Sequence, residues 1–207
     1  MNMQEGPWDK GKAESYARWA KIGSRVVYAP FARKIVKCVA PLEMGSTVVE
    51  LGTGPGLLAI ELCRLLPEAN VIGLDPSGEA VKIARENADE AEISSCETRL
   101  GNAEEIPLAS SSVNLVVTQS SFHEWDNPQK GLSEVLRILR PGGSLIVKDY
   151  NRDWLSKWKR YLLKPFHHLE MFRFNFSDVA NLLREAGFDE VSGEGNGLQF
   201  LVRAVKR

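Results

Sequence analysis

Short apolar segments alternate with helical ones between residues 47 and 150, and this alternation is the strongest constraint on the fold. The apolar or β-branched runs predict strands over residues 47–51, 70–75, 96–101, 113–120 and 144–150. The segments between them predict helices over residues 56–67, 77–91 and 128–143, with Ser77 as an N-cap. Apolar strands separated by helices are typical of a mostly parallel sheet with helices on both faces.

The segment before the first strand is also predicted to be helical. Its helices would cover residues 11–22 and 25–40, and Pro30 would either kink the second helix or divide it into two short ones. The chain has 207 residues, of which 43% are hydrophobic, so it can bury a full core without disulfides or metals. We therefore expect a single domain over residues 1–207.

The pattern changes after the fifth strand. Residues 152–174 form a basic and aromatic segment that is expected to be helical up to Lys164. A helix is predicted over residues 177–188, because a serine stands at its start and a glycine near its end. Two strands, residues 189–197 and 198–207, are close enough in the chain to pair antiparallel through a turn.

Charge and cysteine content exclude several classes of protein. The net charge of −1 does not favour nucleic acid or an anionic membrane as a partner. The three cysteines, Cys38, Cys63 and Cys96, are widely separated and odd in number, which argues against disulfides and zinc. No run approaches the roughly 20 apolar residues of a membrane span, and the N-terminus lacks the apolar centre of a signal peptide. A reducing cytoplasm fits this composition.

The stretch "VVELGTGPGLLAIEL", residues 48–62, combines a strand, a glycine-rich turn and the start of a helix. Such a turn holds a nucleotide at the carboxyl end of a parallel strand. A phosphate-binding P-loop would need a lysine that is absent, and the dinucleotide fingerprint would need glycine where Leu57 stands. A carboxylate at Glu50 would repel a pyrophosphate but suits a cationic ligand such as S-adenosylmethionine (SAM).

Together with two further motifs, this stretch carries a family resemblance. "VELGTGPG", then "GLDPS", then "GNAEEIPLASSSVNLVVTQSSFHEW" resemble the class I SAM-dependent methyltransferases, closest to the small-molecule branch that includes the ubiquinone and menaquinone methyltransferases. The similarity runs from about Thr47 to Tyr150 in order and spacing. It implies a Rossmann-like sheet of seven strands, mostly parallel with one antiparallel strand near the C-terminal edge. It also implies methyl transfer from SAM to a small organic acceptor, with S-adenosylhomocysteine (SAH) as product.

The resemblance places the methionine part of SAM on the first turn. The residues expected to surround it are Glu50, Gly52, Thr53, Gly54 and Gly56. Glycines at such a turn let a ligand lie against bare backbone. Asp75 ends the second strand, and its carboxylate is expected to accept hydrogen bonds from both ribose hydroxyls.

The adenine is expected to contact the ends of the next strands. Pro76 and Ser77 would flank the ring, and Asn102 and Ala103 would meet its edge and its face. Many relatives have aspartate where Asn102 stands. The asparagine oxygen can still accept a hydrogen bond from the adenine amino group, so SAM binding should be retained.

The segment "QSSFHEWDNP" follows the fourth strand and is the best candidate for the acceptor site. The resemblance places Gln119 beside the sulfonium, with Ser120 next to it. His123 is hypothesised to be a general base or a donor that orients the acceptor. The alternative is a packing histidine that braces the SAM loop, because no triad partner is visible in the sequence. No "NPPY" tetrapeptide is present here, which makes amines of nucleic bases or glutamine less favoured acceptors.

No metal is expected. The carboxylates Glu124, Asp126 and Asp149 lie in or after this region, but their motif context differs from that of metal-dependent relatives. The neighbouring His167 and His168 lack further ligands at metal spacing.

The N-terminal helices, residues 9–40, and an insert, residues 151–176, are expected to form a lid over the acceptor site. Their aromatic residues are Trp8, Tyr16, Trp19, Tyr28, Phe31, Trp154, Trp158, Tyr161, Phe166, Phe172 and Phe174. These rings suit a flat or apolar acceptor, or they simply pack the lid on the core. Basic residues between 157 and 164 keep membrane or RNA contact open, although a solvated basic face is the commoner explanation.

Other functions remain open at this point. They are a SAM- or SAH-binding protein without turnover, an RNA or protein methyltransferase, and an NAD-linked oxidoreductase. The acceptor and the oligomeric state are not readable from the sequence.

Overall fold

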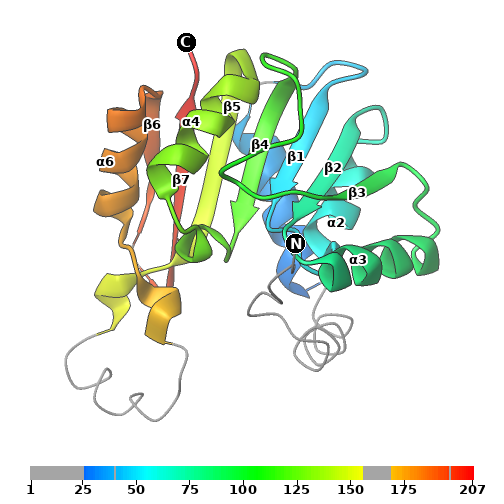
Figure 1. Cartoon of the computed structure of the whole chain (residues 1–207), viewed down its shortest axis with the longest axis horizontal. Helices are drawn as coiled ribbons and strands as arrows, with labels where there is room; N and C mark the ends of the chain where they lie inside the picture. Colours follow the sequence, from blue (N-terminus) through cyan, green and yellow to red (C-terminus); the bar gives the residue numbers. More distant parts are fainter. Residues whose placement is uncertain (1–25, 40, 156–168, 196) are drawn as a thin grey trace, which may run out of the picture. The chain divides into compact units, whose positions relative to one another are not determined.

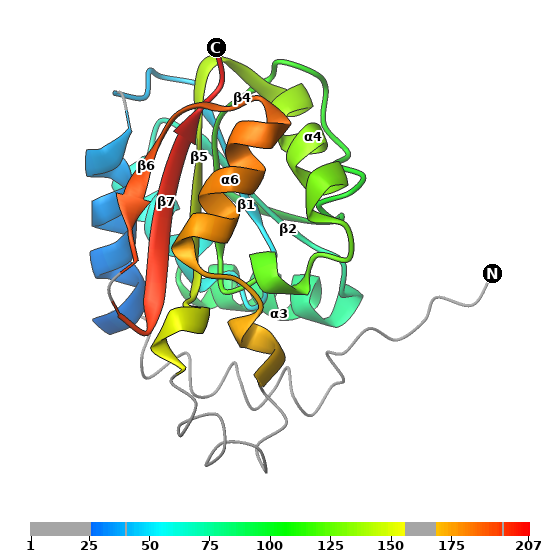
Figure 2. The same ribbon diagram turned by 90° about the vertical axis from the view of Figure 1, so that its left-hand side faces the viewer.

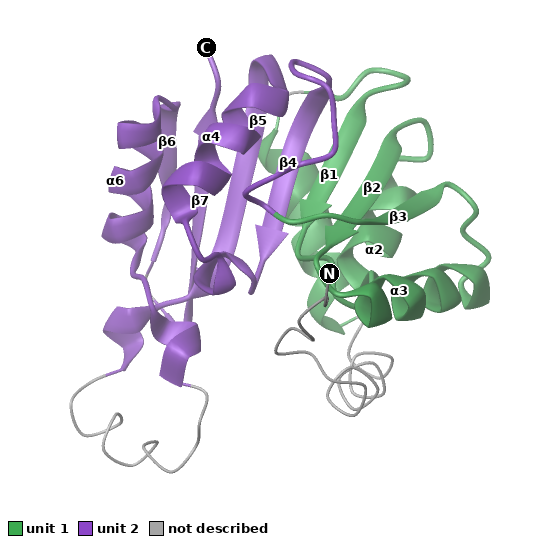
Figure 3. Cartoon of the chain, viewed as in Figure 1, with its two compact units in different colours: residues 1–102 green, residues 103–207 purple. Residues whose placement is uncertain are grey.

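The computed structural model describes residues 26–39, 41–155, 169–195 and 197–207. It divides the chain into two compact units, Met1–Asn102 and Ala103–Arg207, which are coloured separately in Figure 3. The helix predicted over 11–22 lies outside the described residues, and so does the helical segment predicted up to Lys164 from residue 156 onward. The described start of that segment, Arg152–Trp154, is a 3-10 helix. Single-domain organisation and the lid remain predictions.

The first unit contains three parallel strands in the order β3-β2-β1 (Figure 1). They are β1 (Thr47–Leu51), β2 (Asn70–Asp75) and β3 (Cys96–Leu100), each within one residue of its predicted bounds. Helix α2 (Leu57–Leu65) follows β1, and α3 (Gly78–Glu90) follows β2. Both helices pack on the strands of this unit. The parallel register of β1 with β2 places the carboxyl ends of these two strands next to each other.

Residues 26–38 form one continuous helix that includes Pro30. A division into two short helices at this proline, one of the two predicted alternatives, is therefore wrong. Proline removes a single backbone donor, and burial of Phe31, Ala32 and Ile35 holds the helix together around it.

Helix α3 begins as predicted. The Ser77 hydroxyl accepts a hydrogen bond from the backbone N–H of Ala80 at 3.3 Å, which satisfies one of the free donors at the helix start.

The second unit contains four strands in the order β4-β5-β7-β6. They are β4 (Val113–Gln119), β5 (Leu139–Tyr150), β6 (Asp189–Glu194) and β7 (Gln199–Val205). Strands β4 and β5 are parallel, whereas β7 runs antiparallel to both β5 and β6. The predicted antiparallel pairing of the last two strands is confirmed.

The helices of the second unit are α4 (Pro128–Ile138) and α6 (Phe176–Ala186). They pack against each other, and α6 lies along β6 and β7 (Figure 2). Three single-turn 3-10 helices complete the described part of this unit: η1 (Phe122–Glu124), η2 (Arg152–Trp154) and η3 (Leu169–Phe172). Within the described residues, no helix combines the length and the apolar character needed to cross a membrane.

The predicted end of α4 is wrong. The helix stops at Ile138 instead of Gly143, and β5 starts at Leu139, which pairs with Val113 of β4. A residue before proline avoids the helical conformation, so Pro141 already disfavours a helix at the preceding position. Strand pairing then extends β5 through this segment.

The seven strands have the order β3-β2-β1-β4-β5-β7-β6. This order, with β7 antiparallel beside the C-terminal edge, confirms the predicted mostly parallel sheet.

Candidate functional site

The glycine-rich turn of the first unit has the backbone that its sequence predicts. Gly52, Gly54 and Gly56 have φ angles of +70°, +52° and +76°, a region that residues with a side chain rarely adopt. A Cβ at Gly54 would meet no atom within 4 Å, whereas a Cβ at Gly56 would lie 2.9 Å from the Cβ of Ala84 in α3. The turn is thus open at Gly54 and tightly packed at Gly56.

Asp75 ties this turn to the start of α3. Its Oδ2 accepts a hydrogen bond from the backbone N–H of Gly54 at 2.8 Å, and its Oδ1 accepts one from Ser77 at 2.9 Å. Burial raises the pKa of the carboxyl group, and the two backbone bonds act in the opposite direction. Each carboxylate oxygen keeps a second lone pair, which is the acceptor that a ribose hydroxyl requires.

Glu50 lies buried, with 3% of its surface exposed. The Thr53 hydroxyl donates a hydrogen bond to its Oε2 at 2.7 Å. Burial raises the pKa of Glu50 to about 8, and the Thr53 bond only partly opposes that rise. The sequence argument assumed an ionised group. The structure instead keeps Glu50 mostly protonated at pH 7, because no cation accompanies it among the described residues; a cationic ligand would favour its charged form.

Another side chain of this unit also holds the turn. The Asn87 amide of α3 donates a hydrogen bond to the Pro55 carbonyl at 2.8 Å, and this contact is buried. Sequence reasoning missed it, since nothing marks this asparagine among the polar residues of the helix. The predicted adenine contacts Pro76 and Asn102 are both exposed. In the first unit, Glu50 is therefore hydrogen-bonded to Thr53 of the turn. Asp75 is hydrogen-bonded to Gly54 of the same turn and to Ser77, so these residues form one cluster.

In the second unit, the residues after β4 have two unusual features. Gln119 ends the strand, and its Oε1 is buried with no hydrogen-bond partner among the described residues. Ser120 has a φ of +52°, and its backbone N–H donates to the Lys148 carbonyl at 2.8 Å. Strained residues and unpaired buried acceptors are concentrated at functional sites. The Gln119 oxygen fits a ligand that brings a hydrogen-bond donor.

The turn η1 is anchored beside this strand end. The Phe122 ring is fully buried, with its centroid 4.7 Å from that of Trp125 and 5.4 Å from that of Phe174. The Arg173 guanidinium donates to the carbonyls of His123 and Trp125 at 3.3 and 2.7 Å. Packing and hydrogen bonds therefore fix the backbone that carries the histidine.

His123 has a carboxylate partner that the sequence did not reveal. Its Nδ1 lies 2.8 Å from Oδ1 of Asp149, and its backbone N–H donates to Oδ2 at 2.9 Å. The backbone N–H of Tyr150 also donates to Oδ1, at 2.7 Å. The sequence showed no partner for this histidine, and the structure supplies one. The available signal was position: Gln119 pairs with Lys148, so Asp149 stands at the strand end beside the His123 turn.

The surroundings of His123 set its proton affinity. Burial lowers the pKa of the imidazole, but the hydrogen bond and the charge of Asp149 outweigh it, and the net pKa is raised. Glu124, whose Oε1 lies 3.9 Å from Nε2, also raises it, whereas the charge of Arg173 lowers it.

A family model described as a methyltransferase domain matches residues 42–187, more than two thirds of the chain. The chain belongs to the class I SAM-dependent methyltransferases. The predicted recognition, fold class and enzyme class are confirmed. A solved SAM-dependent methyltransferase of Aquifex aeolicus has a TM-score of 0.76 and 22% identity, over 97% of this chain and 100% of that one, which shows the shared fold.

Curated relatives support the same family. A Mycolicibacterium smegmatis protein described as a "Probable S-adenosylmethionine-dependent methyltransferase" is 36% identical over 149 residues, 70% of this chain and 52% of the relative. A demethylmenaquinone methyltransferase of Listeria welshimeri is 26% identical over 156 residues, 75% of this chain and 66% of the relative. This methyltransferase spans between 29% and 66% of the lengths of the first curated relatives it matches.

Aromatic rings continue from His123 toward the surface of the methyltransferase. The Tyr150 ring is edge-on to the imidazole with centroids 6.1 Å apart, and Phe172 lies 5.6 Å from Tyr150. Trp154, which is 36% exposed, stacks on Phe172 at 6.0 Å. The other lid aromatics Trp8, Tyr16, Trp19, Trp158, Tyr161 and Phe166, and the basic residues between 157 and 164, lie outside the described residues.

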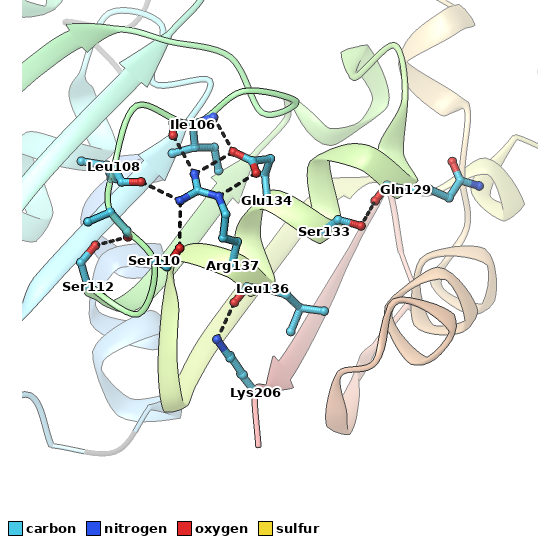
Figure 4. Close-up of polar contacts among 11 residues, drawn as sticks. Ile106, Leu108, Ser110, Ser112, Gln129, Ser133, Glu134, Leu136, Arg137 and Lys206 are labelled. Atoms are coloured by element: carbon cyan, nitrogen blue, oxygen red, sulfur yellow. Dashed lines mark hydrogen bonds and ion pairs between the residues drawn. The ribbon is translucent and has the colours of Figure 1, made fainter.

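The segment after Ala103 is fastened to α4 by a pair that sequence reasoning also missed (Figure 4). Arg137 donates to the carbonyls of Ile106 and Leu108 at 2.9 and 2.8 Å, and Glu134 accepts from the N–H of Ile106 at 3.0 Å. Ala103, the predicted adenine contact at the start of this segment, is buried. Among the described residues, no group of three or more His, Cys, Asp or Glu could hold a metal ion.

Proposed function

We propose that this methyltransferase transfers the methyl group of SAM to a small organic acceptor and releases SAH. The observation that carries the proposal is the Asp75 carboxylate, which holds Gly54 and Ser77 and keeps lone pairs for two ribose hydroxyls. SAM, when bound, supplies a methyl group already activated by a sulfonium. The protein then has to bind it, orient it and exclude water.

The donor half of the site is assigned to the residues predicted from the sequence. Asp75 would accept from the ribose, and the open turn at Gly54 would leave room for the methionine part. Glu50 near the end of β1 accepts a hydrogen bond from Thr53 of that turn, and a cation bound nearby would favour the ionised carboxylate. The remaining assigned contacts are Gly52, Gly56, Pro76, Ser77, Asn102, Ala103, Gln119 and Ser120.

A small acceptor is favoured by two observations. The demethylmenaquinone methyltransferase of Listeria welshimeri aligns with 75% of this chain, and its name specifies a small molecule. The wall of Tyr150, Phe172 and Trp154 would also suit a compact apolar molecule more than a charged polymer.

Calorimetry with SAM, SAH and NAD tests the donor assignment. SAM and SAH should bind, and NAD should not. Asp75→Asn should weaken SAH binding by roughly 10- to 100-fold, because charged hydrogen bonds contribute about 1.5–3 kcal/mol. Asp89→Asn makes the same chemical change at an exposed position of α3 and should bind SAH like the unmodified chain. Binding of NAD alone, or equal affinities for both variants, would contradict the proposal.

Turnover separates an enzyme from a binding protein. SAH release from SAM should appear with members of a panel of small hydroxyl, amine and thiol compounds, and not with total RNA or unfolded protein. Methylation confined to RNA or protein would replace the small-molecule assignment. SAH binding without product across the whole panel would favour a regulator that has lost its chemistry.

A further inference from the structure

We propose that His123 and Asp149 form a proton-accepting pair, and that the acceptor is an aromatic compound methylated on a hydroxyl group. This inference rests on the proposed SAM-dependent methyl transfer and names its substrate class. In this proposal His123 is the catalytic base, and Asp149 is a positioning residue that orients it.

Hydrogen-bond chemistry determines which imidazole nitrogen is basic. An ionised carboxylate only accepts hydrogen bonds, so the 2.8 Å contact with Asp149 places the ring proton on Nδ1. The lone pair of the neutral imidazole is then on Nε2. A lone pair on Nε2 can take a proton from an acceptor, and the imidazolium that results is stabilised by the same carboxylate.

The pair is rigid on both sides. Asp149 is 1% exposed and accepts from three donors: the imidazole and the backbone N–H groups of His123 and Tyr150. The His123 backbone is bound by Arg173, and its neighbour Phe122 is fully buried. Neither partner therefore has to be ordered when an acceptor arrives, which is the condition for efficient general-base catalysis.

The charged groups around the imidazole raise its affinity for a proton. Asp149 of β5 and Glu124 of η1 raise the pKa of His123, while burial and Arg173 lower it, and the net change is upward. Tyr150 contacts the ring edge-on. The raised pKa favours transfer of a proton from an acceptor to this imidazole.

The acceptor class follows from the proton that the acceptor has to lose and from the aromatic rings near His123. Phenols have a pKa of about 10, near enough for an imidazole to assist, whereas an aliphatic amine is already protonated at neutral pH. Tyr150, Phe172 and Trp154 form a continuous aromatic wall from the imidazole to a partly exposed ring. Flat aromatic molecules pack favourably against such rings.

The proposed step is balanced. The phenolic oxygen forms a bond to the methyl carbon while the bond from that carbon to the sulfonium breaks, and sulfur keeps the electron pair as the thioether of SAH. The O–H proton moves to Nε2 of His123 and then to solvent. No oxidant, reductant or further co-reactant is needed.

Nitrogen NMR of the histidine side chains in the full chain tests the pair without an acceptor. His123 should have its neutral proton on Nδ1 and a pKa above the ordinary value. Asp149→Asn should lower that pKa, because it removes the compensating charge. Asp126→Asn changes an exposed acid of the same loop and should leave the titration as it is. A proton on Nε2, or a titration that Asp149→Asn does not move, would overturn the pair.

Two phenolic probes, phenol and 2-naphthol, test the chemistry. With SAM, both should yield the methyl ether, while anisole, which has no hydroxyl, and benzylamine should not react. Asp149→Asn and His123→Gln should each lower kcat by about 100-fold, with little change in the KM for the probe. Asp149→Asn should also shift the rising limb of the pH profile, and Asp126→Asn should leave kcat and the profile unchanged.

The outcomes separate this inference from the proposed function. If the unmodified chain does not bind SAH, the proposed function itself is contradicted. Normal SAH binding with methylation of benzylamine, or with phenols left unmethylated, would overturn the acceptor class alone. Normal methylation of phenols by both variants would overturn the role of the pair.

Discussion

The two units each bury a carboxyl group one residue before the end of a strand, Glu50 in β1 and Asp149 in β5. Their exposures, 3% and 1%, are nearly the same. Their partners differ. Glu50 accepts from the Thr53 hydroxyl, a neutral donor, whereas Asp149 accepts from an imidazole and two backbone N–H groups.

The difference shows that burial alone does not decide what a carboxyl group does. Without a cationic partner, Glu50 retains its own proton, and its pKa rises to about 8. Asp149 lies beside an imidazole, and its hydrogen bond and charge raise the pKa of His123. The first acid is thus neutral near pH 7 in the folded chain, and the second is hydrogen-bonded to an imidazole.

Asp149→Ala should give the largest effect. It removes the acceptor of three buried donors and leaves the imidazole without its partner, so we expect a loss of about 3–5 kcal/mol in the free energy of unfolding. Urea denaturation followed by circular dichroism measures it. Asp126→Ala in the same loop should change stability by less than about 0.5 kcal/mol. Equal effects of the two substitutions would show that the buried carboxylate is not structurally coupled to its donors.

Glu50→Gln should remove a dependence of stability on pH. Between pH 4.5 and about 8 the unfolded glutamate is ionised while the folded one is still protonated, so stability falls as pH rises. The expected slope is about 1.4 kcal/mol per pH unit, and it is absent in the glutamine variant. Urea titrations of both proteins across this window give the slope by difference. Parallel curves would mean that Glu50 ionises in the folded state as it does in water.

Thr53→Val tests the hydrogen bond that the Thr53 hydroxyl donates to Glu50. Loss of one hydrogen bond should cost about 1 kcal/mol. Because the Thr53 bond lowers the pKa of Glu50, its removal should extend the falling limb of stability to higher pH. The same titrations detect the change, and Thr53→Ser, which keeps the hydroxyl, should restore the original limb. If stability falls over the same pH range in the valine variant, the pKa of Glu50 is set by burial and not by the Thr53 hydrogen bond.

Arg173→Met should have the smallest effect. Its charge lowers the pKa of His123, so the imidazole should titrate slightly higher without it. Two hydrogen bonds at the partly exposed edge of η1 are also lost, at a cost of about 1 kcal/mol. Histidine NMR and urea denaturation measure the two changes. A downward movement of the pKa would mean that Arg173 acts by positioning the histidine and not by its charge.

Local chemistry explains what could be predicted. Apolar runs located β1, β2 and β3 within a residue, since a buried parallel strand needs a continuous apolar segment. The glycine turn was predictable because positive φ angles require that residue. The end of α4 was not, because the pairing of Leu139 with Val113 is a long-range contact that competes with local helix signals.

The partners of the two acids were harder to predict for the same reason. His123 and Asp149 lie 26 residues apart, and only the register of β4 with β5 brings them together. The protonation of Glu50 depends on how fully the unit encloses it, which one strand cannot show. Residue types at strand ends identified the candidate site, while their charge states came from tertiary packing.

The two hydrogen bonds that Asp75 accepts from Gly54 and Ser77 also have an evolutionary consequence. A substitution of Asp75 that changed the proposed ribose contact would at the same time release the turn from the helix. In the proposed site, the choice of nucleotide and the stability of the turn therefore depend on one side chain. A lineage exploring new cofactors would first have to acquire another residue that holds the turn.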